Sequence, residues 1–266
     1  MFSAYHIAWM VISVLVIAFT LRYLLKNKVP LNKLLWFAFY AGIVVELIKV
    51  FSLVQMVPNI DKTMYFPYIE TQHIPLNVCS LQKIFIIYVL FTKNKQGREK
   101  VLAFMYPTGL IGALIALFVP AGAAIEWTLL GAFTNPQAYQ FFLYHALLVI
   151  IGAYIPLSGE LQIQKKHFIS SIAMLLVLAL GSMYLNSGFA TATYEAEKVV
   201  RVDYTPNYLF TYKPPISSIK LTEVWHWYLY VLVLTVLALS VIFALYMPFI
   251  KQEETVKVKE KAPENA

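Results

Sequence analysis

The sequence has little charge and a single cysteine. Charged residues make up 13% of the 266 residues, which is about half the share of an ordinary soluble domain. One cysteine, Cys79, excludes an internal disulfide, and no CxxC pattern of metal ligands is present. We therefore expect no metal and no other cofactor, and the low charge argues against a soluble protein.

Apolar residues are plentiful instead, and they come in long blocks rather than at amphipathic spacing. Runs of about 18 or more apolar residues are typical of transmembrane helices. The sequence predicts an all-α membrane protein, a seven-transmembrane-helix bundle, with spans at about 4–24, 34–54, 74–92, 101–119, 137–157, 168–186 and 225–249. These runs leave no room for a separate soluble domain, so residues 1–250 are expected to form one transmembrane domain.

The first apolar run lacks the marks of a removable secretory signal. No basic residue precedes it, the basic residues Arg22, Lys26 and Lys28 follow it, and a small-residue cleavage site is missing. These features indicate a first helix that is retained in the protein.

The net charge of +7 is concentrated in alternate loops. The short loops 25–33, 93–100 and 158–167 hold nine lysine and arginine residues, whereas 55–73 and 120–136 hold only Lys62. Basic loops stay on the cytoplasmic side of a membrane. The bias therefore predicts the N-terminus outside and the C-terminus in the cytoplasm, and it accounts for the charge without a nucleic acid partner. The mixed-charge segment 251–266 is expected to be a disordered cytoplasmic tail.

Several groups that hydrocarbon should exclude lie inside the apolar runs. With this topology and a helical rise of 1.5 Å, they fall roughly 7–14 Å below the outer boundary of the membrane. Charges inside a membrane cost about 3 kcal/mol or more, so they usually pair or face a wet cavity. We expect Glu46 to pair with Lys83 or Lys49, either as polar contacts that hold the bundle or as a functional site. The groups are Glu46, Lys49, Cys79, Gln82, Lys83 and His145.

Cys79 and His145 are the candidates for chemistry in this set. Lys83 lies one helical turn after Cys79 and would stabilise a thiolate, which is the reactive form of cysteine. His145 is expected at a similar depth and could remove the thiol proton. A lone cysteine in an apolar helix is more often an inert small hydrophobic residue, and a membrane histidine can simply bond a carbonyl of a neighbouring helix. The residues alone leave both interpretations open.

The fourth apolar run contains a helix breaker and small residues. Pro107 is expected to kink the helix there. Gly109 and Gly112 on the same helix predict close packing against a neighbouring helix.

Three segments of the chain resemble one known family. They are HIPLNVCSLQKIFIIYVL (His73–Leu90), FFLYHALLVIIGAY (Phe141–Tyr154) and PNYLFTYKPP (Pro206–Pro215). They are similar to the YwaF-like integral membrane proteins of bacteria, a family related to the vertebrate transmembrane protein 164 acyltransferases. The resemblance covers most of the chain, and it departs at Asn77, where relatives commonly have histidine. It implies a multi-pass protein of the bacterial plasma membrane.

The resemblance also implies an activity, the transfer of a fatty acyl chain from a phospholipid to a lipid acceptor. Cys79 would carry the acyl group as a thioester, and His145 would be its base. Membrane phospholipids would then be the partners, near the outer leaflet, with Glu46 and Lys49 in support. Candidate donors to the oxyanion are Gln82, Asn77 and Lys83. Asn207 and Tyr208 in the last outer loop are expected to close over the site.

A different class of function stays open from the sequence. Glu46, Lys49, Lys83 and His145 could form an ion or proton path, or a binding site for a small molecule, in a transporter or membrane binding protein. A transporter usually has internal repeats, and no convincing repeat is visible. A scaffold without chemistry is a third alternative, and no oligomeric state is predicted.

Overall fold

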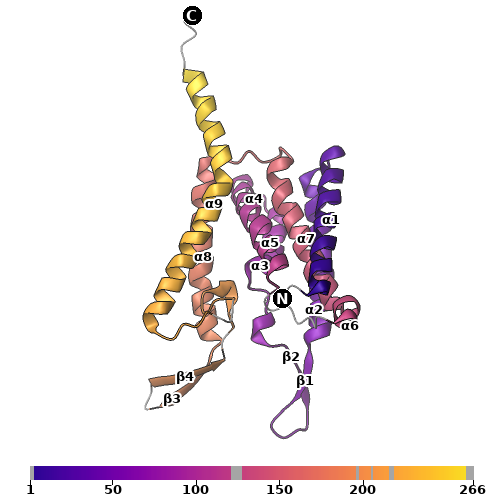
Figure 1. Ribbon diagram of the computed structural model, residues 1–266, viewed down its shortest axis with the longest axis vertical. Helices are drawn as coiled ribbons and strands as arrows, with labels where there is room; N and C mark the ends of the chain where they lie inside the picture. The colour runs from indigo at the N-terminus through magenta and orange to yellow at the C-terminus, as the bar shows by residue number, and fades with distance from the viewer. Residues whose placement is uncertain (1–2, 121–127, 196–197, 205, 216–218, 262–266) are drawn as a thin grey trace, which may run out of the picture.

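The computed structural model is a bundle of long helices with two small β-hairpins (Figure 1). It describes residues 3–120, 128–195, 198–204, 206–215 and 219–261. The α-helices are α1 (Ala4–Lys26), α2 (Leu31–Leu53), α3 (Val78–Phe91), α4 (Lys95–Pro107), α5 (Ala113–Phe118), α6 (Leu129–Thr134), α7 (Pro136–Leu157), α8 (Lys165–Gly188) and α9 (Val224–Lys261).

Successive long helices run in opposite directions across the molecule. The N-terminus and both hairpins lie at one end, and the C-terminus lies at the other (Figure 1). The hairpins are β1 (Gln55–Pro58) with β2 (Tyr65–Tyr68), and β3 (Thr191–Glu195) with β4 (Lys198–Tyr204); both are antiparallel. The loops predicted to face outside therefore gather at the hairpin end.

Six helical segments in the described part of the chain are long and apolar enough to cross a membrane. They are α1, α2, α7, α8, the continuous segment Lys95–Phe118, and α9 over Val224–Gln252. The helical membrane protein that the sequence predicts is thus confirmed. The sidedness of the two ends stays a prediction.

The seventh span is not confirmed at full length. Helix α3 has 14 residues, which extend about 21 Å, less than the roughly 30 Å hydrocarbon core. A 3₁₀ turn, η1 (Thr71–His73), precedes the run that the sequence predicts over 74–92. Ile74, the first residue of that run, has an extended backbone. Proline disfavours helical geometry in the residue before it, so Pro75 delays the helix to Val78.

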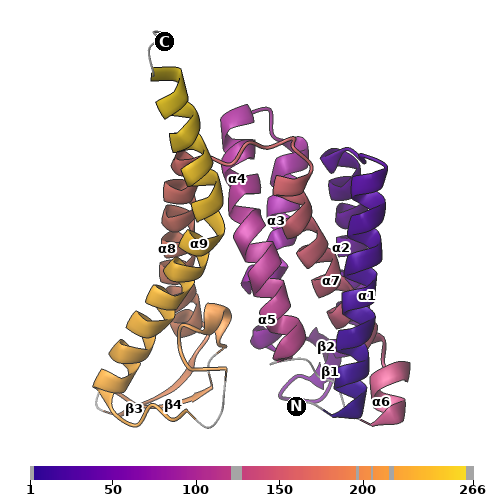
Figure 2. The ribbon, with the colours of Figure 1, turned by 45° about the horizontal axis from the view of Figure 1, so that its top comes forward.

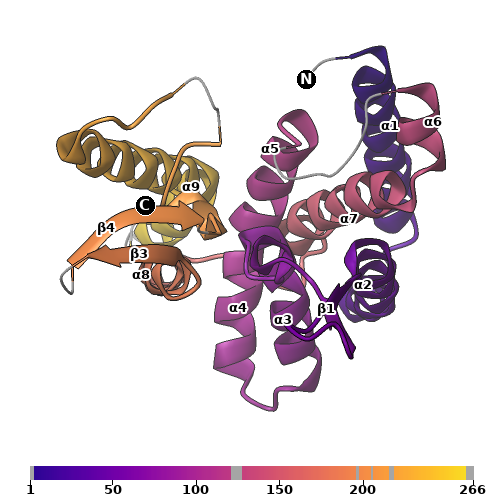
Figure 3. The same ribbon diagram turned by 90° about the horizontal axis from the view of Figure 1, so that it is seen from below.

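Helix α7 is the centre of the bundle. It packs against α1, α2, α4 and α5, and in the view along the bundle it lies between them (Figure 3). The Trp9 indole of α1 stacks on Phe142 with ring centroids 5.1 Å apart, and its Nε1 donates to the Ala132 carbonyl at 2.8 Å. Aromatic contacts of this kind bury large surfaces at the junction of α1, α6 and α7.

The fourth apolar run is one helix interrupted by a π-helical segment, η2 (Thr108–Gly112), directly after Pro107. A Cβ on Gly109 would lie 3.1 Å from the Leu148 carbonyl oxygen, and one on Gly152 would meet the backbone of Leu110. The expected close packing is therefore present at Gly109. It is absent at Gly112, where a Cβ would meet nothing within 4 Å.

Helices α8 and α9 form a pair that runs side by side next to α4 (Figure 2). Helix α9 continues to Lys261, so residues 251–261 are helical, contrary to the disordered tail expected over 251–266; residues 262–266 lie outside the described residues. Glutamate and lysine, which are frequent in this segment, are strong helix formers. The polar composition of this segment therefore did not prevent the helix from continuing.

Candidate functional site

The candidate site is a polar cluster between α2, α3 and α7, near the hairpin end of the bundle. Its thiol, Cys79, lies in the first turn of α3 and is partly exposed. Asn77 immediately precedes the helix, and its side chain does not cap it. Cys79 is therefore placed where an extended segment of the chain turns into the helix, not within a continuous span.

An ion pair joins α2 to α3. Lys83 Nζ donates to Glu46 Oε1, which is the pairing that the depth of the two residues predicts. The Lys83 stem lies across Gly42, where a Cβ would be 3.5 Å from Lys83 Cγ. The ammonium also lies 4.9 Å from the centroid of the Tyr144 ring of α7, within the range of a cation–π contact.

Lys49 fixes the segment that leads into α3. Its ammonium donates to the main-chain oxygen of His73. The His73 side chain is 4.0 Å from the Glu70 carboxylate. Burial and the nearby Lys49 lower the pKa of the His73 imidazole below its usual value of 6.5, although Glu70 acts in the opposite direction. His73 is therefore neutral at pH 7, and the cluster gains no positive charge from it.

His145 lies buried in α7 with its tautomer fixed. Its Nδ1 is 2.7 Å from the Phe141 carbonyl oxygen. A carbonyl only accepts, so Nδ1 carries the proton and Nε2 keeps the lone pair. Among the described residues, no hydrogen bond joins Nε2 to the Cys79 thiol. One ammonium, that of Lys83, interacts electrostatically with both Cys79 and His145.

Gln82 does not face the cluster. Its side chain is buried, and its Nε2 donates to Thr108 Oγ1 at 2.9 Å. Thr108 in turn donates to the Phe104 carbonyl at 2.6 Å. Gln82 therefore connects α3 to the π-helical segment η2, and in this arrangement it is not a donor for an oxyanion at Cys79.

The last outer loop reaches the segment before Cys79. Tyr208, in the 3₁₀ turn η3 (Tyr208–Phe210), donates from its hydroxyl to the Thr71 carbonyl. The Leu209 amide donates to Asn77 Oδ1 at 3.3 Å. The loop thus holds the Asn77 side chain, which makes no capping hydrogen bond to α3. The loop contacts the segment before α3 through Tyr208 and Leu209, and its closure over Cys79 stays a prediction.

Asn207 does not take part in that contact. Its Nδ2 donates to the Lys213 carbonyl at 2.8 Å, and its Oδ1 accepts from the amides of Tyr212 and Lys213 at 3.2 and 3.1 Å. It therefore holds the loop in shape and does not reach the cluster.

Tyr144 belongs to the cluster and is not identified by the sequence. Its ring faces Lys83, and its hydroxyl interacts electrostatically with Cys79 and Glu46. The hydroxyl is buried without a hydrogen-bond partner among the described residues. A buried phenol without a hydrogen-bond partner is costly, so the Tyr144 hydroxyl has hydrogen-bonding capacity left for another group.

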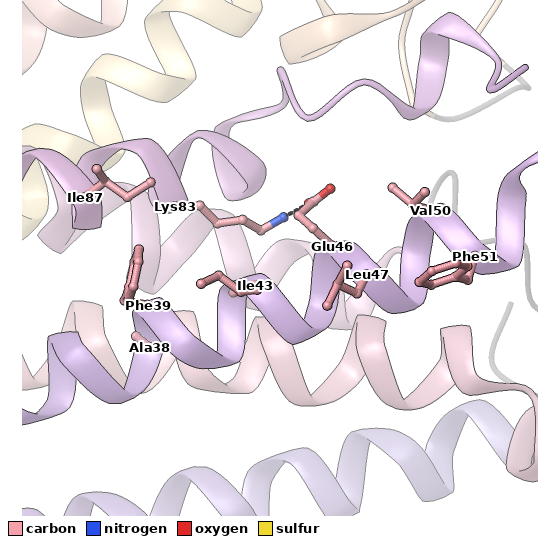
Figure 4. A pocket seen from close by; sticks show the side chains of 10 residues that line it. Ala38, Phe39, Ile43, Glu46, Leu47, Val50, Phe51, Lys83 and Ile87 are labelled. Atoms are coloured by element: carbon pink, nitrogen blue, oxygen red, sulfur yellow. Dashed lines mark hydrogen bonds and ion pairs between the residues drawn. The ribbon is translucent and has the colours of Figure 1, made fainter. Parts of the chain in front are cut away.

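Two hollows open beside the ion pair. The larger, about 340 Å³, is the α2–α3 groove, lined mainly by Phe39, Ile43, Leu47 and Val50 of α2 and by Lys83 and Ile87 of α3, with Glu46. Figure 4 shows Lys83 and Glu46 pointing toward each other between Phe39 at one end of the groove and Phe51 at the other. The smaller, about 150 Å³, is lined by Glu46, Lys49 and Val50 and by His73, Ile74 and Pro75.

The fold and this cluster define a multi-pass helical membrane protein with charged, thiol and imidazole groups inside its bundle. Comparison with protein families gives the more specific assignment. The TMEM164 family model matches residues 1–246, and the chain belongs to that family. Neither the curated proteins nor the solved structures gave a match.

Proposed function

We propose that the protein is a membrane acyltransferase that moves a fatty acyl chain from a phospholipid to a lipid acceptor through a thioester on Cys79. His145 acts as the base. The observation that carries the proposal is geometric: the Lys83 ammonium, one helical turn after Cys79 on α3, lies 4.9 Å from the centroid of the Tyr144 ring, and Tyr144 directly precedes His145 on α7. Cys79 and His145 therefore belong to one polar cluster.

The first half-reaction forms the thioester. His145 Nε2 takes the proton of the Cys79 thiol, and the thiolate attacks the carbonyl carbon of a phospholipid ester. The C–S bond forms, the ester C–O bond breaks, and the leaving lysolipid oxygen takes the proton from His145. The Phe141 carbonyl supports this role, because it fixes the proton on Nδ1 and leaves Nε2 to act as base.

The second half-reaction releases the acyl group. An acceptor hydroxyl gives its proton to His145 and attacks the thioester carbonyl. The new C–O bond forms, the C–S bond breaks, and the sulfur recovers its proton. Lys83 and the unpaired Tyr144 hydroxyl are the donors available in the cluster for the oxyanion in both steps.

The absence of a hydrogen bond between Cys79 and His145 is compatible with this mechanism. Catalytic hydrogen bonds are often long or misaligned without substrate and tighten when it binds. A rotation of the partly exposed Cys79 side chain is the change that the mechanism requires.

Thioester chemistry is tested by trapping the acyl-enzyme. Purified protein is incubated with a phospholipid that has a fluorescent acyl chain, denatured, and separated with and without hydroxylamine. We expect a fluorescent protein band that hydroxylamine removes, that Cys79→Ala lacks, and that His145→Gln reduces strongly. Equal labelling of wild type and Cys79→Ala would show that the cysteine carries no acyl group.

The matched control is a substitution of a buried polar side chain remote from the cluster. Ser171→Ala removes a hydroxyl that is 2.9 Å from Tyr246 OH in the α8–α9 pair. It should leave acyl-enzyme formation unchanged. If Ser171→Ala reduces labelling as much as His145→Gln does, the loss reports general instability and not base catalysis.

We further infer that the cluster lies in the outer half of a bacterial plasma membrane. Basic loops support this sidedness, because the connection between α3 and α4, which is rich in lysine, lies at the end opposite the hairpins. A single cysteine in the β1–β2 loop, Lys62→Cys in a Cys79→Ser background, should react with a membrane-impermeant maleimide in intact cells. Reaction only after lysis would reverse the orientation.

A further inference from the structure

The α2–α3 groove has an apolar part and a polar end. Its apolar part is lined by Phe39, Ile43, Leu47 and Ile87. The smaller hollow, with Lys49 and His73, shares the lining residues Glu46 and Val50 with the groove, so the two lie next to each other along α2. The combined shape is that of a site for an amphiphile, apolar along the helix and polar near the end of α2.

We propose that this groove binds one phospholipid of the surrounding leaflet, with an acyl chain along α2 and the phosphate at Lys49. The inference rests on the proposed function only in taking the bound lipid to be the acyl donor. Binding itself needs no thioester, so the two can fail separately.

The length of the groove fits a chain within one leaflet. From Ala38 to Val50, both of which line it, the helix rises about 18 Å at 1.5 Å per residue. Half of the hydrocarbon core is about 15 Å thick. Lys49 lies four residues before the end of α2, about 6 Å from it. An acyl chain in the groove would therefore bring its head group to Lys49.

Charge distinguishes this groove from an ordinary lipid-facing surface. Lipid chains are as apolar as the side chains they would cover, so apolar contact alone selects no particular lipid. The side chains that line the two hollows include two lysines and one glutamate, a net charge of +1. Glu46 pairs with Lys83, which leaves Lys49 to balance an anion. Basic groups between membrane helices bind lipid head groups in this way.

Lys49 also has hydrogen-bonding capacity left for a phosphate. An ammonium has three N–H donors, and Lys49 uses one on the His73 carbonyl. The other titratable groups around it are Glu46 and Lys83 in the groove, the neutral His73, and Glu70, which lies next to His73. A phosphate oxygen would meet the remaining N–H groups in a region of low dielectric, where such pairs are strong.

The test maps where a photoreactive lipid sits. The full chain in nanodiscs receives phosphatidylglycerol with a diazirine in one acyl chain, and cross-linked peptides are identified by mass spectrometry. We expect label on α2 and α3 peptides of the groove above that on α8, which serves as the reference for general lipid contact. Equal labelling of α2, α3 and α8 for equal exposed area would overturn the proposal.

A pair of adjacent substitutions gives the matched control. Ile43 lines the groove and is 46% exposed, whereas Val44 is 54% exposed and lies outside the lining. Neither change affects the buried core. Ile43→Trp should reduce the α2 and α3 label to the α8 level, and Val44→Trp should leave it unchanged. Equal effects of the two substitutions would contradict a defined groove.

The polar end is tested with Lys49→Gln and two lipids. Loss of one lysine near the membrane surface should weaken phosphatidylglycerol labelling about fivefold and leave labelling by an uncharged diacylglycerol probe unchanged. An equal loss for both lipids, or none for either, would overturn the assignment of Lys49 to the phosphate. Cys79→Ser should still be labelled in the groove; groove labelling without any acyl-enzyme would retain this inference and reject the proposed chemistry.

Discussion

The α2–α3–α7 cluster and the α8–α9 pair both bury polar side chains, but in opposite ways. In the α8–α9 pair and the loop that joins its helices, the partners are neutral: Ser182 and Asn186 of α8 both bond Thr211 Oγ1 of the loop, at 3.0 and 2.9 Å. In the cluster the groups are charged or reactive, and the Tyr144 hydroxyl and the His145 Nε2 have no described hydrogen bond.

The difference follows from what the two regions have to achieve. Burying apolar side chains contributes little free energy to helix association in lipid, because lipid chains are equally apolar. Hydrogen bonds between polar side chains therefore supply part of the free energy of association. The α8–α9 pair has little buried apolar surface, and the hydroxyls of Ser171 and Tyr246 meet between its two helices at 2.9 Å. Helix α7 has a large apolar interface, so the polar groups beside it are not needed for association. The polar groups of the second region therefore have a structural explanation, whereas those of the first are the groups to which we assign the proposed function.

The largest loss of stability is expected when only one member of the Glu46–Lys83 ion pair is removed. Lys83→Met leaves the Glu46 carboxylate without its partner. Removing one member of a buried pair costs about 3 kcal/mol or more. Because Glu46 is 30% exposed, we expect the lower end of that range, read as a lower midpoint of thermal unfolding in detergent.

The matching double substitution separates stability from function. Glu46→Gln with Lys83→Met removes both charges, and replacing a buried pair with neutral groups is often close to neutral for stability. The double variant should recover most of the melting temperature but still form no acyl-enzyme. If it recovers both stability and acyl-enzyme formation, the ion pair would have a structural role like the contacts of the α8–α9 pair.

A second effect concerns the apolar core beside the cluster. Gly152→Ala places a Cβ against the backbone of Leu110, and overpacking of this kind costs about 2 kcal/mol. Gly181→Ala on α8 is the control, because a Cβ there would meet nothing within 4 Å. Only the first should lower the unfolding temperature. A similar loss of unfolding temperature in Gly181→Ala would mean that α8 is packed as closely at Gly181 as α7 is at Gly152.

A third effect tests the loop that joins the two regions. Asn186 accepts from the Tyr208 amide at 2.8 Å and donates to the Tyr208 carbonyl at 3.2 Å. Asn186→Ala removes the side-chain acceptor of the buried Tyr208 amide, which costs about 1.5 kcal/mol, whereas the Tyr208 carbonyl still accepts from Thr211. Hydrogen exchange of residues 206–213 should become faster. Unchanged exchange there would show that Asn186 does not hold the loop.

The smallest effect is expected for a single neutral contact. The Tyr246 hydroxyl donates to the Ala103 carbonyl at 2.7 Å and lies 2.9 Å from Ser171 Oγ. Tyr246→Phe should lower stability by about 0.6 kcal/mol, the average for such bonds between membrane helices, with acyl-enzyme formation intact. A loss of acyl-enzyme formation would extend the functional region to α9.

Much of the fold was predictable, because transmembrane helices are identified by long apolar runs alone. The runs over 4–24 and 137–157 correspond closely to α1 and α7. The run over 74–92 was misjudged, because hydrophobicity does not distinguish an extended apolar segment from a helix. Pro75 gave the local signal, and only the fold showed that residues before Val78 reach α2 through Lys49.

The site was predictable in part for a related reason. Depth along a helix follows from the 1.5 Å rise, so Glu46 and Lys83 could be matched in height before their ion pair was known. The rotation of a helix about its axis does not follow from depth, and Gln82 therefore turned out to face Thr108. Tyr144 gave no signal in an apolar helix, because aromatic side chains there usually pack.

The sequence by itself determined that the chain lies in a membrane and where most of its long helices lie, because both depend on local hydrophobicity. It also predicts a common depth for the polar groups from the helical rise. The tertiary structure alone decided which of these groups meet. It brought Lys83 to Glu46 and Tyr144, set Gln82 apart, fixed the His145 proton, and opened a groove between α2 and α3. Such contacts depend on how helices rotate and pack against α7, and no local pattern in the chain specifies that.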